Sequence, residues 1–154
     1  MPLTGRKRCC GKLIDPARTH FLGRVPYDTY RTVLQVSAAH VYLTYPFVLS
    51  WSMLEAMASG CLVIGSRTAP VEEVLRDGEN GLLVDFFDKE AIADRVIEAV
   101  ENPERYAAMR ELAREEVATQ FSRKEGLRRY RDLVQPIFRP QLVTVKGARS
   151  EACL

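Results

Sequence analysis

The sequence lacks any long hydrophobic run, and it has few of the residues that most often hold metals or form disulfides. No apolar stretch approaches the roughly 20 residues of a membrane-spanning helix, and no charged start leads into the apolar core of a secretion signal. The chain of 154 residues has four cysteines and two histidines, without the spacing of a zinc site. These absences argue against a membrane-spanning or secreted protein, and we expect a cytoplasmic one.

The cysteines suggest two different environments. Cys9 and Cys10 are adjacent in a basic stretch, where they could bind a metal, oxidise, or remain reduced in a flexible end. Cys61 lies in an apolar strand pattern and is expected to be a small core residue.

Positive charge is concentrated at the two ends of the chain. Lys and Arg number 22 against 20 Asp and Glu, and the basic excess falls within residues 1–20 and 139–154, so the middle is net acidic. A nucleic-acid-binding domain carries its basic residues on a folded face, so we expect no nucleic-acid partner. We expect a basic, disordered end (1–18), one folded domain (19–135) and a tail (136–154).

Short strand patterns alternate with helix patterns along the folded part. The expected strands are 19–22, 40–44, 61–65 and 82–84. The expected helices begin near Pro26, Ser52 and Pro70, and after Asp88, Asn102 and Ser122. The helix after Asp88 should bury Ile92, Val96 and Val100, and the next Tyr106, Met109, Ala113 and Val117. The alternation predicts an α/β fold with a partial doubly wound, Rossmann-like parallel sheet.

The loop at residues 45–51 and the helix after it are the most informative stretch. Ligands of parallel sheets bind beyond the carboxyl ends of strands, near helix N-termini. With Ser52 as the helix cap, the backbone N–H groups of residues 50–54 could bind a phosphate. Glu55 could accept hydrogen bonds from two neighbouring sugar hydroxyls, although its spacing alone fits better with an acid that complements the helix dipole.

Three segments together resemble one enzyme family. The stretch LEAMASGCLVIGSRTAPVEEVLRDGENGLLVD is similar to the donor-binding region of the retaining family 4 glycosyltransferases, which have the GT-B fold. HFLGRVPYDTYRTVLQVSAAHVYL before it and FSRKEGLRRYRDLV after it fit the same family in order and spacing. The resemblance covers residues 19–135. It implies the C-terminal half of a GT-B enzyme that transfers a hexose-like sugar from a nucleotide-sugar with retention.

The resemblance also implies roles for single positions. Glu55 matches the second Glu of the family's Glu-x7-Glu motif, the one that holds the nucleotide ribose. Residues 66–71 match a corner near the pocket, where packing is an equal alternative. The loop toward the donor sugar and diphosphate corresponds to Phe47, Val48, Leu49, Ser50, Trp51 and Ser52, and the loop against the base to Gly23, Arg24 and Val25. No catalytic residue is assigned by these motifs.

Two departures from the family pattern stand out. Phe47 occupies the place of the first Glu, which contacts the transferred sugar, and phenylalanine cannot accept a hydrogen bond. Phe47 and Trp51 could equally pack under the loop. A complete enzyme has an acceptor domain and a basic diphosphate clamp that should precede residue 19, and we do not find their patterns there.

Three hypotheses follow. The chain could be a donor-domain fragment of a glycosyltransferase, inactive alone. It could also be a nucleotide-sugar-binding module without turnover, or a decayed remnant that needs a partner chain. The resemblance implies a nucleotide-sugar as substrate, with no cofactor and no metal. It also implies an acceptor glycan or lipid-linked sugar, reached through a missing N-terminal domain, and it is compatible with peripheral membrane contact.

The resemblance further implies a gap in the sheet. Strands one and two of the parent sheet would be missing, which leaves unpaired edges. We therefore expect 40–44, 61–65 and 82–84 to form one parallel sheet, with 19–22 displaced, poorly ordered or newly paired. The isolated chain is expected to melt early or to self-associate.

Overall fold

The computed structural model describes residues 14–15, 17–45 and 47–138. The strands are β1 (Ala39–Tyr42), β2 (Leu62–Ser66) and β3 (Leu82–Val84). The helices are α1 (Tyr27–Val36), α2 (Trp51–Ala58), α3 (Ala69–Glu72), α4 (Lys89–Glu101), the 3-10 helix η1 (Pro103–Tyr106), α5 (Ala107–Gln120) and α6 (Arg123–Phe138). Strands and helices alternate through β3, which confirms the predicted α/β class.

The three strands form one parallel sheet in the order β1-β2-β3. His40 pairs with Val63 and Gly65 pairs with Leu83, so the expected sheet of 40–44, 61–65 and 82–84 is confirmed to within a few residues at the ends. The strand expected at 19–22 is wrong, because this segment is irregular and Phe21 is 82% exposed. It does not join the described sheet, and a short apolar segment without a paired neighbour has no ladder to stabilise it.

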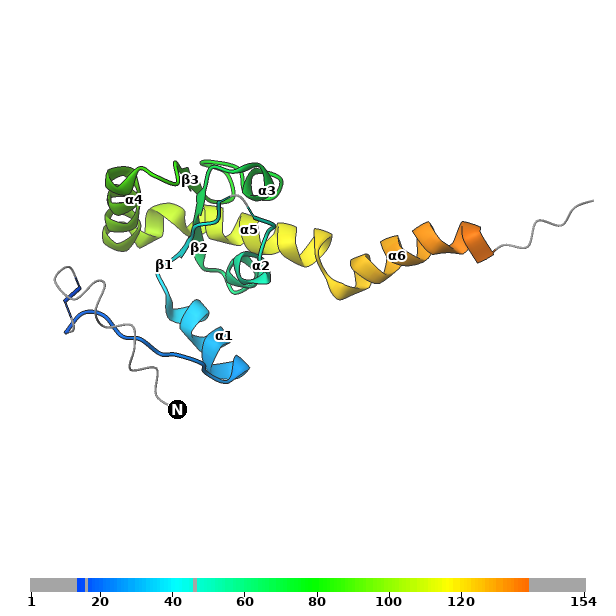
Figure 1. Ribbon diagram of the computed structural model, residues 1–154, viewed down its shortest axis with the longest axis horizontal. Coiled ribbons are helices and arrows are strands. Elements are labelled where there is room, and N and C mark those ends of the chain that lie inside the picture. Colours follow the sequence, from blue (N-terminus) through cyan, green and yellow to red (C-terminus); the bar gives the residue numbers. More distant parts are fainter. Residues whose placement is uncertain (1–13, 16, 46, 139–154) are drawn as a thin grey trace, which may run out of the picture.

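The central strand, β2, is buried on both faces, as its continuous apolar run predicted. On one face, Val63 belongs to a core with Met53 and Met57 of α2 and with residues of α5. On the other, Leu62 and Ile64 pack with α4 and η1. Figure 1 shows α4 on one side of the strands and α2 on the other, so the sheet is the middle layer of three.

Two of the three predicted caps on the second half of the chain are confirmed, but the Asn102 side chain makes no cap hydrogen bond at the start of η1. One helix also differs in phase from its prediction. Asp88 accepts a hydrogen bond from the Ala91 N–H at 2.8 Å and caps α4. Val100 is 58% exposed, whereas Ala99 is buried beside Ile92 and Val96, so the predicted place of Val100 in the inward stripe is wrong. The stripe of the following helix is confirmed, since Tyr106, Ala113 and Val117 are buried and Met109 packs against the core that contains Tyr106.

The last helix leads away from the sheet (Figure 1). Its predicted cap is confirmed, because the Ser122 hydroxyl accepts from the Glu125 N–H at 3.2 Å. Leu127 and Tyr130 are exposed, so the apolar face of α6 has no cover among the described residues. The helix runs through Pro136 to Phe138, slightly beyond the point where we expected order to end.

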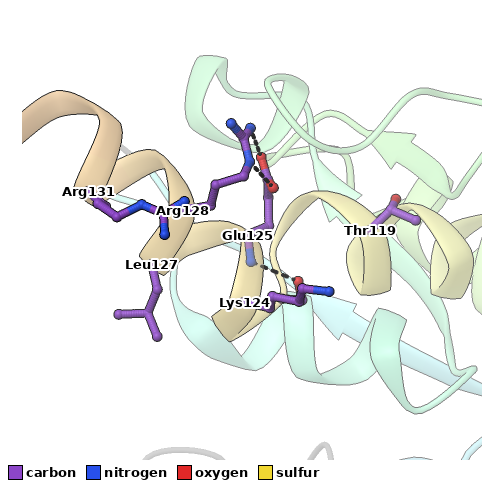
Figure 2. A pocket seen from close by; sticks show the side chains of 7 residues that line it. Thr119, Lys124, Glu125, Leu127, Arg128 and Arg131 are labelled. Atoms are coloured by element: carbon purple, nitrogen blue, oxygen red, sulfur yellow. Dashed lines mark hydrogen bonds and ion pairs between the residues drawn. The ribbon is translucent and has the colours of Figure 1, made fainter. Parts of the chain in front are cut away.

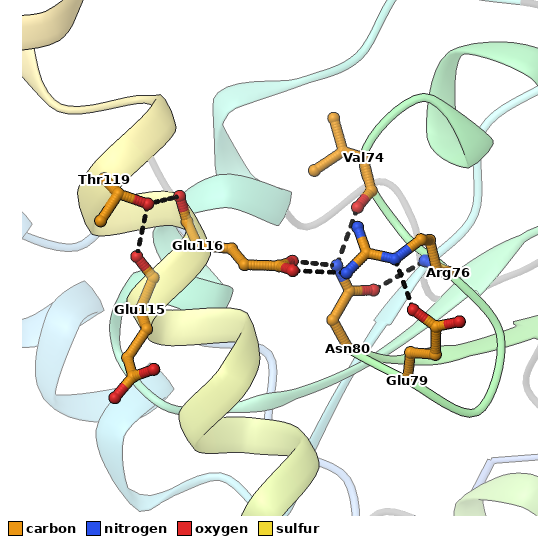
Figure 3. Close-up of polar contacts among 7 residues, drawn as sticks. All are labelled: Val74, Arg76, Glu79, Asn80, Glu115, Glu116 and Thr119. Carbon is orange, nitrogen blue, oxygen red and sulfur yellow. Dashed lines mark hydrogen bonds and ion pairs between the residues drawn. The ribbon is translucent and has the colours of Figure 1, made fainter.

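The turn between α3 and β3 is tied to α5 by polar contacts (Figure 3). Asn80 is 1% exposed; its amide oxygen accepts from the Arg76 N–H at 2.6 Å, and its amide nitrogen donates to Glu116 Oε2 at 2.7 Å. The same amide nitrogen donates to the Val74 carbonyl at 3.0 Å. Because Arg76 also pairs with Glu116, one side chain of α5 holds both ends of the turn.

The expected core cysteine is confirmed. Cys61 is buried ahead of β2, and burial raises the pKa of its thiol to about 11, so the thiol stays protonated at neutral pH. Cys9, Cys10 and most of the basic end and of the tail lie outside the described residues, and the domain boundaries at 18 and 135 stay predictions.

Candidate functional site

The loop after β1 and the start of α2 lie at the carboxyl end of the sheet, where the sequence placed the site. The helix cap is Ser50 and not Ser52, so the predicted cap is wrong: the Ser50 hydroxyl accepts from the Ser52 N–H at 3.4 Å. The Ser50 N–H donates to the Tyr42 hydroxyl at 2.7 Å. The Met53 N–H donates to the Ser50 carbonyl at 3.3 Å. Three N–H groups that we expected to be open to a phosphate are therefore engaged within the chain.

Glu55 is half-buried on α2 and faces the start of α1. The Tyr27 hydroxyl donates to Glu55 Oε1 at 3.3 Å. Tyr27 follows the turn that contains Gly23, Arg24 and Val25, and Gly23 has the left-handed φ of 65° that glycine adopts easily. The structure thus brings the predicted ribose residue close to the helix that begins just after the predicted base loop.

An open cleft of about 590 Å³ lies beside this loop, between the segments that follow β1 and β2. Its lining residues are Tyr45, Phe47, Val48, Arg67, Thr68, Ala69 and Pro70. Phe47 is 72% exposed and Trp51 is 78% exposed, so neither side chain is buried under the loop. Phe47 lines the cleft together with residues of the 66–71 corner, and its sugar-facing role stays a prediction.

The cleft is mostly apolar, and its one lining cation is already paired. Arg67 forms ion pairs with Asp77 at 2.9 Å and with Glu72 at 3.6 Å. Ser66, which ends β2, is buried and donates to the Thr44 carbonyl at 2.9 Å, a packing role that the sequence left as an alternative for this corner. Arg67 is therefore held at the rim and is poorly placed to act as a diphosphate clamp.

A second hollow, of about 560 Å³, lies at the corner between α5 and α6 (Figure 2). Its lining residues are Thr119, Ser122, Lys124, Glu125, Leu127, Arg128 and Arg131. Arg128 pairs with both Glu125 and Asp132, and the hydrogen bonds from Arg128 and Arg129 lower the pKa of Glu125 to about 2. These ion pairs stabilise the start of α6, and none of the predicted site residues lines this hollow.

Sequence reasoning missed two residues near Glu55. Tyr27 and Tyr30 lie one helical turn apart on α1, and both side chains adjoin the Glu55 carboxylate. Their spacing of three residues after Pro26 was visible in the sequence, but nothing local indicated that α1 would lie against α2.

The described part of the chain contains neither a membrane-spanning helix nor a metal-binding group of side chains. No described helix has the length and apolar character needed to cross a bilayer. The described residues also contain no group of three acidic, histidine or cysteine side chains placed to hold a metal ion.

The parallel sheet with helices on both faces is a Rossmann-like α/β arrangement, and it matches the fold of a GT-B glycosyltransferase domain. A sucrose-phosphate synthase from Thermosynechococcus elongatus has the same arrangement: the TM-score is 0.70 at 26% identity, over 80% of this chain and 31% of that chain.

Residues 7–116 match the family model described as glycosyl transferases group 1, and the chain belongs to this family. The N-acetyl-alpha-D-glucosaminyl L-malate synthase of Bacillus anthracis is 30% identical over 79% of this chain and 32% of its own length. Sucrose-phosphate synthase 4 of Arabidopsis thaliana is 30% identical over 72% of this chain and 10% of its own length. The chain thus spans about a third or less of these relatives.

Proposed function

We propose that this chain is the donor-binding part of a glycosyltransferase that takes its sugar from a nucleotide-sugar and retains the configuration. The observation that carries the proposal is the place of Glu55, half-buried on α2 and joined by a hydrogen bond to the helix that follows Gly23, Arg24 and Val25. A carboxylate in this position has the acceptor capacity for a ribose. The family membership and the similarity to two synthases of this family support sugar transfer as the chemistry.

In this proposal each part of the donor has its own subsite. The ribose binds at Glu55, the base lies against residues 23–25, and the sugar extends toward the cleft lined by Phe47 and Val48. The diphosphate lies at residues 48–52, and the basic clamp comes from the part of the parent protein that the relatives have in addition. That part would also bring an acceptor glycan or a lipid-linked sugar, with peripheral membrane contact, so the chain alone has no turnover.

The test is the replacement Glu55→Ala in the complete protein. Loss of a charged hydrogen-bonding partner should cost about 1.5–3 kcal/mol, which weakens nucleoside diphosphate binding roughly tenfold or more. Calorimetric titration with uridine, guanosine and adenosine diphosphates measures it. Glu101→Ala is the matched control. It removes the same charge from an exposed glutamate at the end of α4, outside the elements that form the proposed site. Unchanged affinity in Glu55→Ala would overturn the assignment.

A second candidate is a nucleotide-sugar-binding module without turnover. Phe47 favours it, because an exposed phenyl ring stands at the cleft where the family usually has a carboxylate. The complete protein distinguishes the two candidates when incubated with a panel of nucleotide-sugars and acceptors. Release of nucleoside diphosphate supports the enzyme, whereas tight donor binding without consumption supports the module.

A further inference from the structure

Two phenol groups of α1 converge on the carboxylate of Glu55. Tyr27 donates to Glu55 Oε1 at 3.3 Å, and the ring centroids of Tyr27 and Tyr30 are 6.1 Å apart with a tilt of 41°. Residues three positions apart share one face of a helix, so α1 presents both hydroxyls to the same side of α2.

The Tyr30 hydroxyl differs from that of Tyr27 because it is buried and unsatisfied within the described part of the chain. It is shielded from water and has no hydrogen-bond partner among the residues that the structure describes, an arrangement that is unfavourable for a buried donor. Burial, and after it the neighbouring Glu55 carboxylate, raises the pKa of Tyr30 to about 12. The phenol therefore keeps its proton at neutral pH. Among the described residues, it is an unsatisfied hydrogen-bond donor that lies next to Glu55.

Packing alone does not account for these hydroxyls. Tyr27 is 59% exposed, so its ring buries little surface, and a phenylalanine at position 30 would pack without an unsatisfied oxygen. A carboxylate has two oxygens and about four acceptor positions. If the two phenols occupy one side of it, the other side stays open to a pair of adjacent hydroxyls.

We propose that Tyr27 and Tyr30 are positioning residues that hold Glu55 for the two adjacent hydroxyls of a donor ribose. The proposal rests on the proposed function, since it assumes that Glu55 binds the nucleotide. A turn of the Glu55 side chain on binding gives the Tyr30 hydroxyl its missing acceptor. Tyr27 restrains the Glu55 carboxylate before binding, which lowers the entropic cost of binding, and Tyr30 supports the carboxylate once the ribose is bound. The site should therefore prefer ribonucleotides to 2′-deoxyribonucleotides, and the tyrosines should set the strength of this preference.

The experiment compares Tyr27→Phe and Tyr30→Phe in the complete protein by calorimetric titration. The probes are a nucleoside diphosphate and its 2′-deoxy counterpart. Each variant should weaken ribonucleotide binding by roughly three- to tenfold and weaken binding of the 2′-deoxy compound less, so that the preference between them falls. Tyr130→Phe, which removes a phenol from the exposed face of α6, is the control and should change neither affinity.

Thermal unfolding separates positioning from structure. Tyr30→Phe removes a buried hydroxyl without a partner, so its Tm should stay equal or rise while its ribonucleotide affinity falls. A lower Tm with equal losses for both nucleotides would overturn the proposal. If both tyrosine variants keep the preference for the ribonucleotide while Glu55→Ala loses binding, the positioning role of the tyrosines is overturned and the proposed function stands. No loss in Glu55→Ala would instead overturn the proposed function.

Discussion

Phe47 is the single residue whose replacement should reveal sugar selection. It is exposed on the cleft and offers no hydrogen-bond acceptor, whereas Glu55 is not among the residues that line this cleft. Phe47→Glu should therefore change the relative rates with different donor sugars and leave nucleoside diphosphate affinity nearly the same. Rates with a panel of nucleotide-sugars that share one base, together with a calorimetric titration, measure both quantities in the complete protein.

The control for this change is Phe121→Glu. Phe121 is also exposed, but it lies at the end of α5 and does not line the cleft. It receives the same new charge, so its donor preference should match that of the unchanged protein. If Phe47→Glu also shows the unchanged preference, Phe47 only packs against the loop.

At the scale of elements, the turn held by Asn80 depends on a charged Glu116 on α5 (Figure 3). Burial raises the pKa of Glu116, but hydrogen bonds from Arg76 and Asn80 outweigh it, and the net pKa lies below its ordinary value. A lowered pKa in the folded state adds stability above the unfolded value of about 4.3, and this stability is lost as the pH falls through the folded pKa.

Glu116→Gln should therefore lower the free energy of unfolding at neutral pH, and the deficit should shrink as the pH falls below about 4.3. Urea denaturation of the complete protein at a series of pH values measures the difference from the unchanged protein. Glu115→Gln is the matched control, because this exposed neighbour on α5 makes no side-chain contact with the turn in Figure 3. A deficit that is the same at every pH would contradict the prediction.

At the scale of the whole molecule, the sheet has an open edge. Among the described residues, β1 pairs only with β2, and Val41 and Leu43 are exposed near this edge. Unpaired edges promote association between chains. The 154-residue chain should therefore associate with rising concentration in sedimentation experiments, and the proposed parent protein, in which further strands cover this edge, should not.

A charge on the edge strand tests this reason directly. Val41→Lys should weaken self-association of the 154-residue chain, because lysine on an edge opposes strand pairing. Val100→Lys places the same charge on the exposed side of α4 and should have little effect. A chain that stays monomeric and unfolds cooperatively at all concentrations would refute the open-edge account.

The sequence by itself determined the local features. The apolar run at 61–65 predicted a fully buried strand, and the side chains of Asp88 and Ser122 marked helix starts that the structure confirms. These signals need only neighbouring residues, since a cap satisfies N–H groups within one turn and a fully apolar run indicates burial on both faces. The family motif also brought Glu55 forward as a site residue, which is a prediction that awaits its titration.

The tertiary structure alone decided what depends on distant partners. Residues 19–22 have strand-forming side chains but lie outside the described sheet, because a strand needs a neighbour to pair with. The sheet face set the phase of α4 and buried Ala99 where the sequence suggested Val100. The contact between Tyr27 and Glu55 joins positions 28 residues apart. No local pattern encodes it, because only the packing of α1 against α2 brings the two side chains together.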